Sequence, residues 1–215
     1  MIAAVAAIES QAPRAGETPV VVELFTSQGC SSCPPADALL SQLARDRKVI
    51  ALAYHVDYWN RLGWRDPFSS REWSQRQGEY VRAMKLASAY TPQIVVNGAR
   101  EMVGSNSFAV KRAIEEESRR KPEGTITLTR TRDGVDVRAQ SSRRDVELIV
   151  VTYENGATTK VESGENRGRT LANDAIVRSL IRTQKFEVHV PVAQQLEVAA
   201  VRPERGPRRI VAAAR

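Results

Sequence analysis

Residues 19–45 read PVVVELFTSQGCSSCPPADALLSQLAR, a pattern that predicts a strand followed by a helix. The apolar, β-branched run over residues 20–25 is typical of a buried strand. Over residues 36–45 apolar side chains recur at helical spacing, and the two preceding prolines fit a first helical turn, where N–H groups lack intrahelical partners. Cys30 and Cys33 therefore lie at a strand–helix junction.

The chain continues to alternate between strands and helices up to residue 121. Asn97-Gly98 predicts a tight hairpin turn between two of the later strands. Further strands are expected over residues 49–56, 93–96 and 101–103, and further helices over residues 70–86 and 106–121. This order of elements indicates an α/β domain over residues 19–123.

After residue 124 only strand signals are found, separated by turn sequences such as Asp133-Gly134. The run over residues 146–153 is apolar almost throughout, as in strands that are buried on both faces. The expected strands cover residues 125–130, 135–139, 146–153, 158–161, 176–181, 186–190, 198–201 and 210–213. We therefore expect a smaller all-β, sandwich-like domain over residues 124–215, and we assign no chemistry to it.

The overall composition limits the possible classes of protein. The 215 residues include 32 basic and 25 acidic side chains, a formal net charge of +7, but the two signs are interleaved and form no basic stripe with aromatic residues. No apolar run approaches the roughly 20 residues of a membrane-spanning helix. Two cysteines are too few for a disulfide-stapled small protein. We expect neither nucleic-acid binding nor a membrane span, and the oligomeric state stays open.

Residues 1–18 are expected to form a mobile leader. They are mostly polar after residue 8, and Ala4-Val5-Ala6 has the small-x-small form of a signal-peptide cleavage site. This favours the remnant of an export signal, and an unstructured start without that role is the alternative.

The spacing of Cys30 and Cys33 is the strongest chemical signal in the sequence. Residues three apart at a helix start are separated by about one turn, so the two sulfur atoms can bond if the loop bends. The positive end of the helix dipole favours a thiolate, which is the form that attacks disulfides. Cys30 is expected to be the more exposed and more reactive of the two. A purely structural disulfide is the alternative interpretation.

His55 and Asp57 end a strand that should run parallel to the first one, so their side chains are expected beside the cysteines. The segment over residues 54–68, which includes Trp59, is aromatic and charged. It is either a substrate groove, in which His55 tunes a thiolate or moves protons, or a rim of packed aromatic rings.

Thr91-Pro92 opens a strand that should run antiparallel beside the first strand. The start of that strand would then lie next to Cys30. A cis proline there offers no N–H and leaves neighbouring backbone free to pair with a substrate.

Residues 20–121 resemble a thioredoxin fold, with Cys30-Ser31-Ser32-Cys33 in place of its redox motif and Thr91-Pro92 in place of its cis-proline loop. The resemblance implies that Cys30 attacks, that Cys33 resolves the mixed disulfide and that Pro92 contacts the substrate. More narrowly, GCSSCPPAD, HVDYWNRLGW, YTPQIVVNG and GENRGR together resemble a family of exported, mostly bacterial thioredoxin-like proteins of uncharacterised function.

The sequence also departs from thioredoxin. Gly29 stands where thioredoxin has Trp, and Ser31-Ser32 replaces Gly-Pro, so the redox potential cannot be transferred. Glu23 resembles the buried acid that assists proton transfer in thioredoxins, but it lies one position out of register. An edge or surface carboxylate is the alternative for Glu23.

Together these observations predict a thiol–disulfide oxidoreductase that acts on exported proteins or small disulfides, in the periplasm or outside a bacterial cell, without an organic cofactor. Two alternatives stay open. Cys30, Cys33 and His55 form a ligand set suited to copper or zinc, or the disulfide is structural within a binding module. The segment GENRGR lacks the context of a phosphate-binding loop and is expected to be a turn that links two strands.

Overall fold

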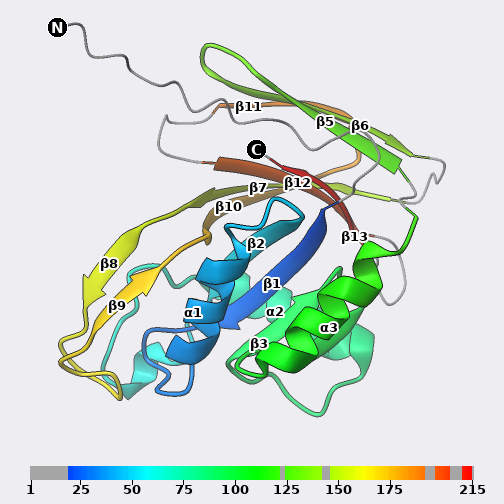
Figure 1. Cartoon of the computed structure of the whole chain (residues 1–215). Helices are drawn as coiled ribbons and strands as arrows, with labels where there is room; N and C mark the ends of the chain where they lie inside the picture. The colour runs from blue at the N-terminus through cyan, green and yellow to red at the C-terminus, as the bar shows by residue number, and fades with distance from the viewer. Residues whose placement is uncertain (1–18, 122–123, 142–145, 192–196, 204–209, 215) are drawn as a thin grey trace, which may run out of the picture.

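The computed structural model describes residues 19–121, 124–141, 146–191, 197–203 and 210–214. The leader over residues 1–18, predicted to be mobile, lies outside the described residues. The fold is mixed α/β, with an eight-stranded mixed sheet beside separate three-stranded and two-stranded antiparallel sheets (Figure 1).

The first half of the chain forms the elements that its alternation predicts. They are β1 (Val20–Thr26), α1 (Pro34–Leu43), β2 (Val49–His55), α2 (Arg71–Met84), β3 (Gln93–Val96), β4 (Arg100–Val103) and α3 (Ser107–Ser118), with a short 3-10 helix, η1 (Asn60–Leu62), in addition. β1 pairs parallel with β2 and antiparallel with β3, as expected. β3 and β4 form the hairpin predicted from Asn97-Gly98.

The second half does not form a sandwich of its own, so this part of the expected fold is corrected. Its strands are β5 (Gly124–Arg130), β6 (Gly134–Ser141), β7 (Leu148–Glu154), β8 (Ala157–Lys160), β9 (Thr170–Asn173), β10 (Ile176–Thr183), β11 (Glu187–Pro191), β12 (Glu197–Pro203) and β13 (Ile210–Ala214). Four of them extend the first sheet, whose order is β13-β12-β7-β10-β2-β1-β3-β4. Among the described strands, β11-β6-β5 and β8-β9 form sheets without strands from the first half.

The two halves join at β2. β10 runs parallel to β2, and the Ala53 N–H donates to the Ala175 carbonyl at 2.7 Å. All seven residues of β2 are buried. A buried strand needs a pairing strand on each side, because an edge strand leaves a row of backbone N–H and C=O groups unpaired. The apolar pattern of a strand indicates burial but does not identify the strand that pairs with it.

β7 separates two hydrophobic cores, as its two apolar faces predict. Ile149 and Val151 pack into the main core with β1 and β2, whereas Leu148 and Val150 pack against Val137 of the three-stranded sheet. Figure 1 shows β11-β6-β5 stacked on this part of the large sheet. β7 belongs to the large sheet, and each of its two faces contributes to a different core.

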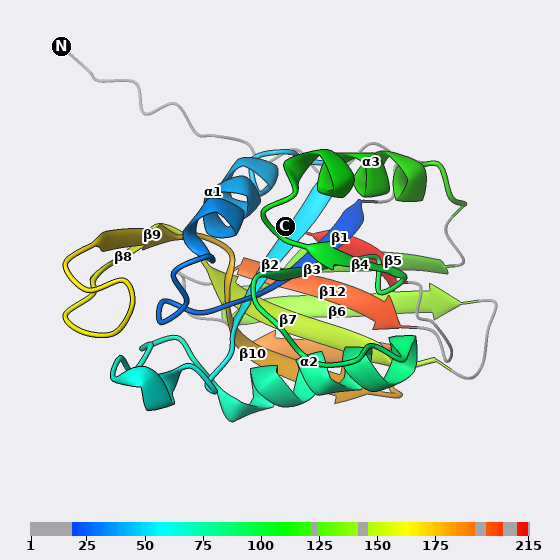
Figure 2. The same cartoon turned by 90° about the horizontal axis from the view of Figure 1, so that it is seen from below.

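The helices cover both faces of the β1–β4 part of the sheet. Figure 2 shows α1 and α3 on one face and α2 on the other. The β8-β9 hairpin projects from the second half and lies beside α1 in both views. Within the described residues, no helix is both long enough and apolar enough to cross a membrane.

Candidate functional site

Cys30 and Cys33 form a disulfide in the loop between β1 and α1. Their Cα atoms are 5.4 Å apart. α1 begins at Pro34, so Cys33 is the N-cap residue and Cys30 lies before the helix. Both cysteines are fully buried, and the Ser32 hydroxyl oxygen lies 3.3 Å from Cys30 Sγ. The expectation that Cys30 is the more exposed of the two is therefore wrong for the disulfide-bonded protein.

Several backbone N–H groups around the disulfide donate hydrogen bonds to backbone carbonyls of the same loop. The Cys30 N–H donates to the Ser27 carbonyl at 3.1 Å, and the Cys33 N–H donates to the Cys30 carbonyl at 3.2 Å. Pro34 and Pro35, at the first positions of α1, carry no N–H. The start of α1 therefore offers the cysteine sulfurs fewer free backbone N–H groups than a helix start without prolines would offer.

Trp59 connects the cysteine loop with the loop before β3. Its indole N–H donates to the Thr91 hydroxyl at 2.8 Å. Its Cβ lies 3.2 Å from the place that a Cβ on Gly29 would occupy. This close approach accounts for a glycine directly before Cys30, and it places Trp59 and Thr91 at the predicted site.

Pro92 lies at the same end of the sheet, and its peptide bond with Thr91 is cis, as predicted. The Gly104 N–H donates to the Pro92 carbonyl at 2.8 Å. A Cβ on Gly104 would lie 3.2 Å from Pro92 Cβ and 3.1 Å from the Cβ of Ala36, in the first turn of α1. Pro92 is therefore held close to the helix that follows the disulfide.

His55 belongs to a buried cluster of charged groups next to the cysteine loop. Its Nδ1 lies 2.7 Å from Asp66 Oδ2, which also accepts the Gln28 N–H at 2.8 Å. Burial alone would lower the pKa of His55, but the Asp66 and Asp37 carboxylates outweigh it and raise that pKa above its usual value. Burial would raise the pKa of Asp66, but His55 and two backbone N–H donors hold it below its usual value. The His55 ring and the Asp66 carboxylate thus form a buried pair, and within the described residues the other ring nitrogen of His55, Nε2, has no hydrogen-bond partner.

Asp37 joins this cluster from α1, and the sequence analysis missed it. It follows Cys33 by four residues, so the two side chains share one face of the helix. Burial raises the pKa of Asp37 to about 6, although His55 and a 2.8 Å hydrogen bond from the Thr26 hydroxyl favour the charged form. The available signal was an acid one turn after Cys33, beside the apolar face of a helix.

Glu23 and Asp57 are placed elsewhere. Glu23 is fully buried, so it is not the edge or surface carboxylate considered above. Arg76 Nε donates to one Glu23 oxygen at 2.7 Å, and the Tyr80 hydroxyl donates to the other. These partners belong to α2, across the sheet from α1 (Figure 2). Asp57 accepts a 2.5 Å hydrogen bond from the Ser74 hydroxyl, also in α2.

The loop between β8 and β9 completes the surroundings of the disulfide. The Asn166 side chain is buried, and its Nδ2 donates to the carbonyls of Gln28 and Cys30, each at 2.9 Å. Glu165 Oε2 accepts the Ser31 N–H at 2.9 Å. The predicted strand-linking turn is confirmed here, but its contact with the cysteine loop was not foreseen. In the sequence, the family resemblance of GENRGR was the only signal that this loop belongs to the site.

Cys30, Cys33 and His55 do not form a metal-binding group. Within the ranges that the structure describes, no three His, Cys, Asp or Glu side chains are arranged to hold a metal ion. The two sulfurs are bonded to each other, and His55 Nδ1 is engaged by Asp66. In this disulfide-bonded form the three side chains are therefore not arranged as ligands of one metal ion.

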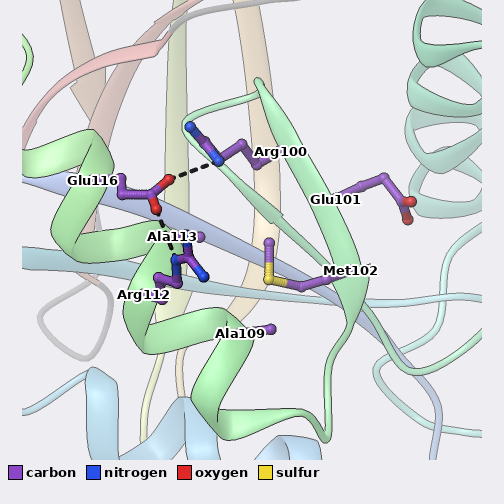
Figure 3. Close-up of a pocket in the computed structure, with 7 residues that line it drawn as sticks. All are labelled: Arg100, Glu101, Met102, Ala109, Arg112, Ala113 and Glu116. Carbon is purple, nitrogen blue, oxygen red and sulfur yellow. Dashed lines mark hydrogen bonds and ion pairs between the residues drawn. The ribbon is translucent and has the colours of Figure 1, made fainter.

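A cavity of about 470 Å³ between β4 and α3 contains neither cysteine. Figure 3 shows Glu116 paired with both Arg100 and Arg112 at this cavity. Its lining consists of Arg100, Glu101, Met102, Ala109, Arg112, Ala113 and Glu116. None of these residues belongs to the disulfide site, so the cavity and that site are separate features.

Two solved structures resemble this chain. Protein AGR_C_4864 from Agrobacterium tumefaciens, solved by X-ray crystallography, is 26% identical with a TM-score of 0.79, over 92% of this chain and 94% of that one. HBP35 of Porphyromonas gingivalis is 15% identical with a TM-score of 0.58, over 93% of this chain and 75% of that one. The second likeness concerns the fold alone. No curated protein matches this chain.

One family model matches most of the chain, over residues 21–213. The match includes both cysteines, Pro92 and the loop that carries Asn166, so it spans the site from both halves of the sequence. The chain therefore belongs to DUF1223, a family of proteins of unknown function.

Proposed function

We propose that this protein is a thiol–disulfide oxidoreductase whose redox pair is Cys30 and Cys33. The observation that carries the proposal is the disulfide between these two residues in the loop from β1 into α1. The strand order β2-β1-β3-β4, with Thr91-Pro92 directly before β3, supports a thioredoxin-like unit over residues 19–121.

The exchange proceeds in two steps when the reduced protein meets a disulfide. The Cys30 thiolate attacks one substrate sulfur, and the other substrate sulfur leaves as a thiolate. Deprotonated Cys33 then attacks the Cys30 sulfur of the mixed disulfide, which forms the Cys30–Cys33 bond and releases the second substrate sulfur. Two electrons pass to the substrate. The reverse sequence oxidises a substrate dithiol, and the difference in reduction potentials decides the direction.

Asp37 is suited to accept the proton that Cys33 loses. Both side chains are buried and lie on one face of the helix. Its pKa of about 6 lies near neutral pH, where a proton acceptor is both largely deprotonated and still basic. Asp37 thus fills the role that the sequence suggested for Glu23.

We propose an oxidised protein or a small disulfide as the substrate, in the periplasm or outside the cell. Disulfides persist in such oxidising compartments, and Ala4-Val5-Ala6 suits cleavage of an export signal. The exchange steps require no organic cofactor.

A trapping experiment tests this function. In Cys33→Ser, a mixed disulfide at Cys30 cannot be resolved, so the substrate sulfur stays attached. When the reduced variant is offered a small aromatic disulfide, intact mass spectrometry is expected to show one adduct per chain, which dithiothreitol then removes.

Cys30→Ser is the matched control, because it also keeps a single cysteine in the same loop. It is expected to form much less adduct under identical conditions. Equal adduct on both variants would contradict the assignment of Cys30 as the attacking residue. Absence of adduct on both variants would contradict disulfide exchange itself.

A further inference from the structure

The β8–β9 loop, residues 161–169, is fixed to the cysteine loop by hydrogen bonds from its side chains. Asn166 is only 1% exposed, and its Nδ2 donates hydrogen bonds to the carbonyls of Gln28 and Cys30, the residues before and after Gly29. Glu165 accepts the N–H of Ser31, the residue after Cys30. This loop therefore holds the backbone on both sides of Cys30.

The same loop also closes against the segment after η1. The Ser163 hydroxyl donates to the Gly63 carbonyl at 2.5 Å. Gly164, at φ +75°, lies so close to Trp64 that a Cβ there would be 3.0 Å from the Trp64 Cβ. The indole N–H of Trp64 in turn donates to Gln28 Oε1 at 3.2 Å. The loop thus bridges the cysteine loop and the aromatic segment.

The hairpin that carries this loop is a unit apart from the large sheet. β8 and β9 pair only with each other among the described strands. The loop is closed internally, since the Gly168 N–H donates to the Val161 carbonyl at 2.8 Å and the Arg169 N–H to the Asn166 carbonyl at 3.1 Å. It can therefore move as one piece without breaking the backbone ladder of the large sheet.

Exchange at Cys30 requires such a movement. Both cysteines are fully buried, whereas the rate of thiol–disulfide exchange depends on access of the attacking sulfur to the one attacked. Among the other neighbours of the cysteine loop, α1 and the cis-proline loop are built on strands and helices of the main core. The segment that carries Trp59 and Asp66 is anchored by the buried Asp66, which lies 2.7 Å from His55 of β2. The 161–169 loop contacts the cysteine loop through the hydrogen bonds of Asn166 and Glu165, and its one buried apolar side chain is Val161.

We propose that the 161–169 loop is a gate of the redox site. Closed, it positions the Gln28–Ser31 backbone through Asn166 and shields the disulfide. Open, it admits the substrate sulfur to Cys30. Asn166 is thus a positioning residue, and the gate determines which disulfides and thiols reach the pair. This inference rests on the proposed redox function of Cys30 and Cys33.

The rate at which a small neutral phosphine reduces the Cys30–Cys33 bond tests the gate. A phosphine reduces disulfides irreversibly and is itself oxidised to the phosphine oxide with an oxygen from water, so its rate reports access. With tris(hydroxypropyl)phosphine on the full chain, followed by alkylation and mass spectrometry, Asn166→Ala is expected to be reduced about tenfold faster than the wild type. That factor corresponds to the loss of two hydrogen bonds from the closed state.

Two controls separate gating from a general loss of stability. Arg167→Ala changes an exposed residue of the same loop and is expected to leave the rate unchanged. Val137→Ala opens space in the remote core under the three-stranded sheet and is also expected to leave the rate unchanged. A wild-type rate for Asn166→Ala, or equal acceleration by Val137→Ala, would overturn the gate.

Glu165→Ala provides a second variant if Asn166→Ala does not fold. It removes one hydrogen bond from an exposed residue, and about threefold faster reduction is expected; an unchanged rate would overturn the gate. Failure of the gate and failure of the function are distinguishable. Unchanged phosphine rates with successful trapping contradict only the gate, and accelerated rates without any trapping contradict only the redox function.

Discussion

Replacing Glu23 with alanine is expected to lower the free energy of unfolding by about 3–5 kcal/mol. The Glu23 carboxylate is fully buried and pairs with Arg76 at 2.6 Å. Its removal leaves a guanidinium without its counter-charge in a site that is almost closed to water, where an uncompensated charge is costly. Denaturant unfolding at neutral pH measures the change, which should appear in the midpoint with an unchanged slope.

Glu115→Ala is the matched control for this prediction. Glu115 pairs with Arg119 on the exposed face of α3, and loss of such a surface pair is expected to cost less than about 1 kcal/mol. A double variant, Glu23→Leu with Arg76→Met, should recover most of the lost stability, because it removes both charges. A loss below about 1 kcal/mol in Glu23→Ala would contradict the structural role assigned to this pair.

Asp37→Asn is expected to stabilise the protein by about 2–3 kcal/mol above pH 6 and to have no such effect near pH 4. The folded-state pKa of Asp37 is about 6, raised from 3.8 by burial. The folded protein therefore binds this proton more tightly than the unfolded chain, and the contribution of Asp37 to the free energy of unfolding falls as pH rises from about 4 to about 6. Asparagine keeps an acceptor for the Thr26 hydroxyl and has no charge to bury.

The difference in unfolding free energy between wild type and Asp37→Asn, followed from pH 4 to pH 8, measures this effect. Asp133→Asn, at an exposed position, is the control and should show no comparable rise. A difference that does not vary with pH would contradict the burial of a titrating Asp37. The same variant is also expected to slow the release of substrate from the mixed disulfide at neutral pH, since Cys33 loses its proton acceptor.

The first half of the fold could be predicted from the sequence because its patterns are local. The β-branched run before Cys30, the helical spacing after Pro35 and the Asn97-Gly98 turn each specify one element through its immediate neighbours. The order of these elements then leaves few arrangements for the sheet. The same reasoning placed Cys30, Cys33, Trp59 and Thr91-Pro92 at one end of it.

The joining of the two halves could not be predicted in this way. The pairing of β10 with β2 depends on contacts between residues such as Ala53 and Ala175, more than a hundred positions apart. Alternation of apolar residues identifies both strands but not their partnership. The short strand β9 was missed altogether, because TLAN, its sequence, shows a single strongly apolar residue.

The buried polar residues of the site were also beyond local patterns. His55 and Asp66 meet through the folding of an irregular segment, and Asn166 reaches Cys30 from the other half of the chain. Asparagine in a glycine-rich turn is ordinarily explained by the turn itself. Only the tertiary structure separates that role from the two hydrogen bonds that Asn166 makes to the cysteine loop.

The reduction potential of the Cys30–Cys33 pair tests the central claim most directly. The full chain is equilibrated with defined mixtures of reduced and oxidised dithiothreitol, and the two states are separated by mass after alkylation. An exchanging pair predicts a potential above about −300 mV, within the range of thiol–disulfide oxidoreductases. A potential well below about −300 mV would mark an inert structural bond and would contradict the redox function proposed for this site.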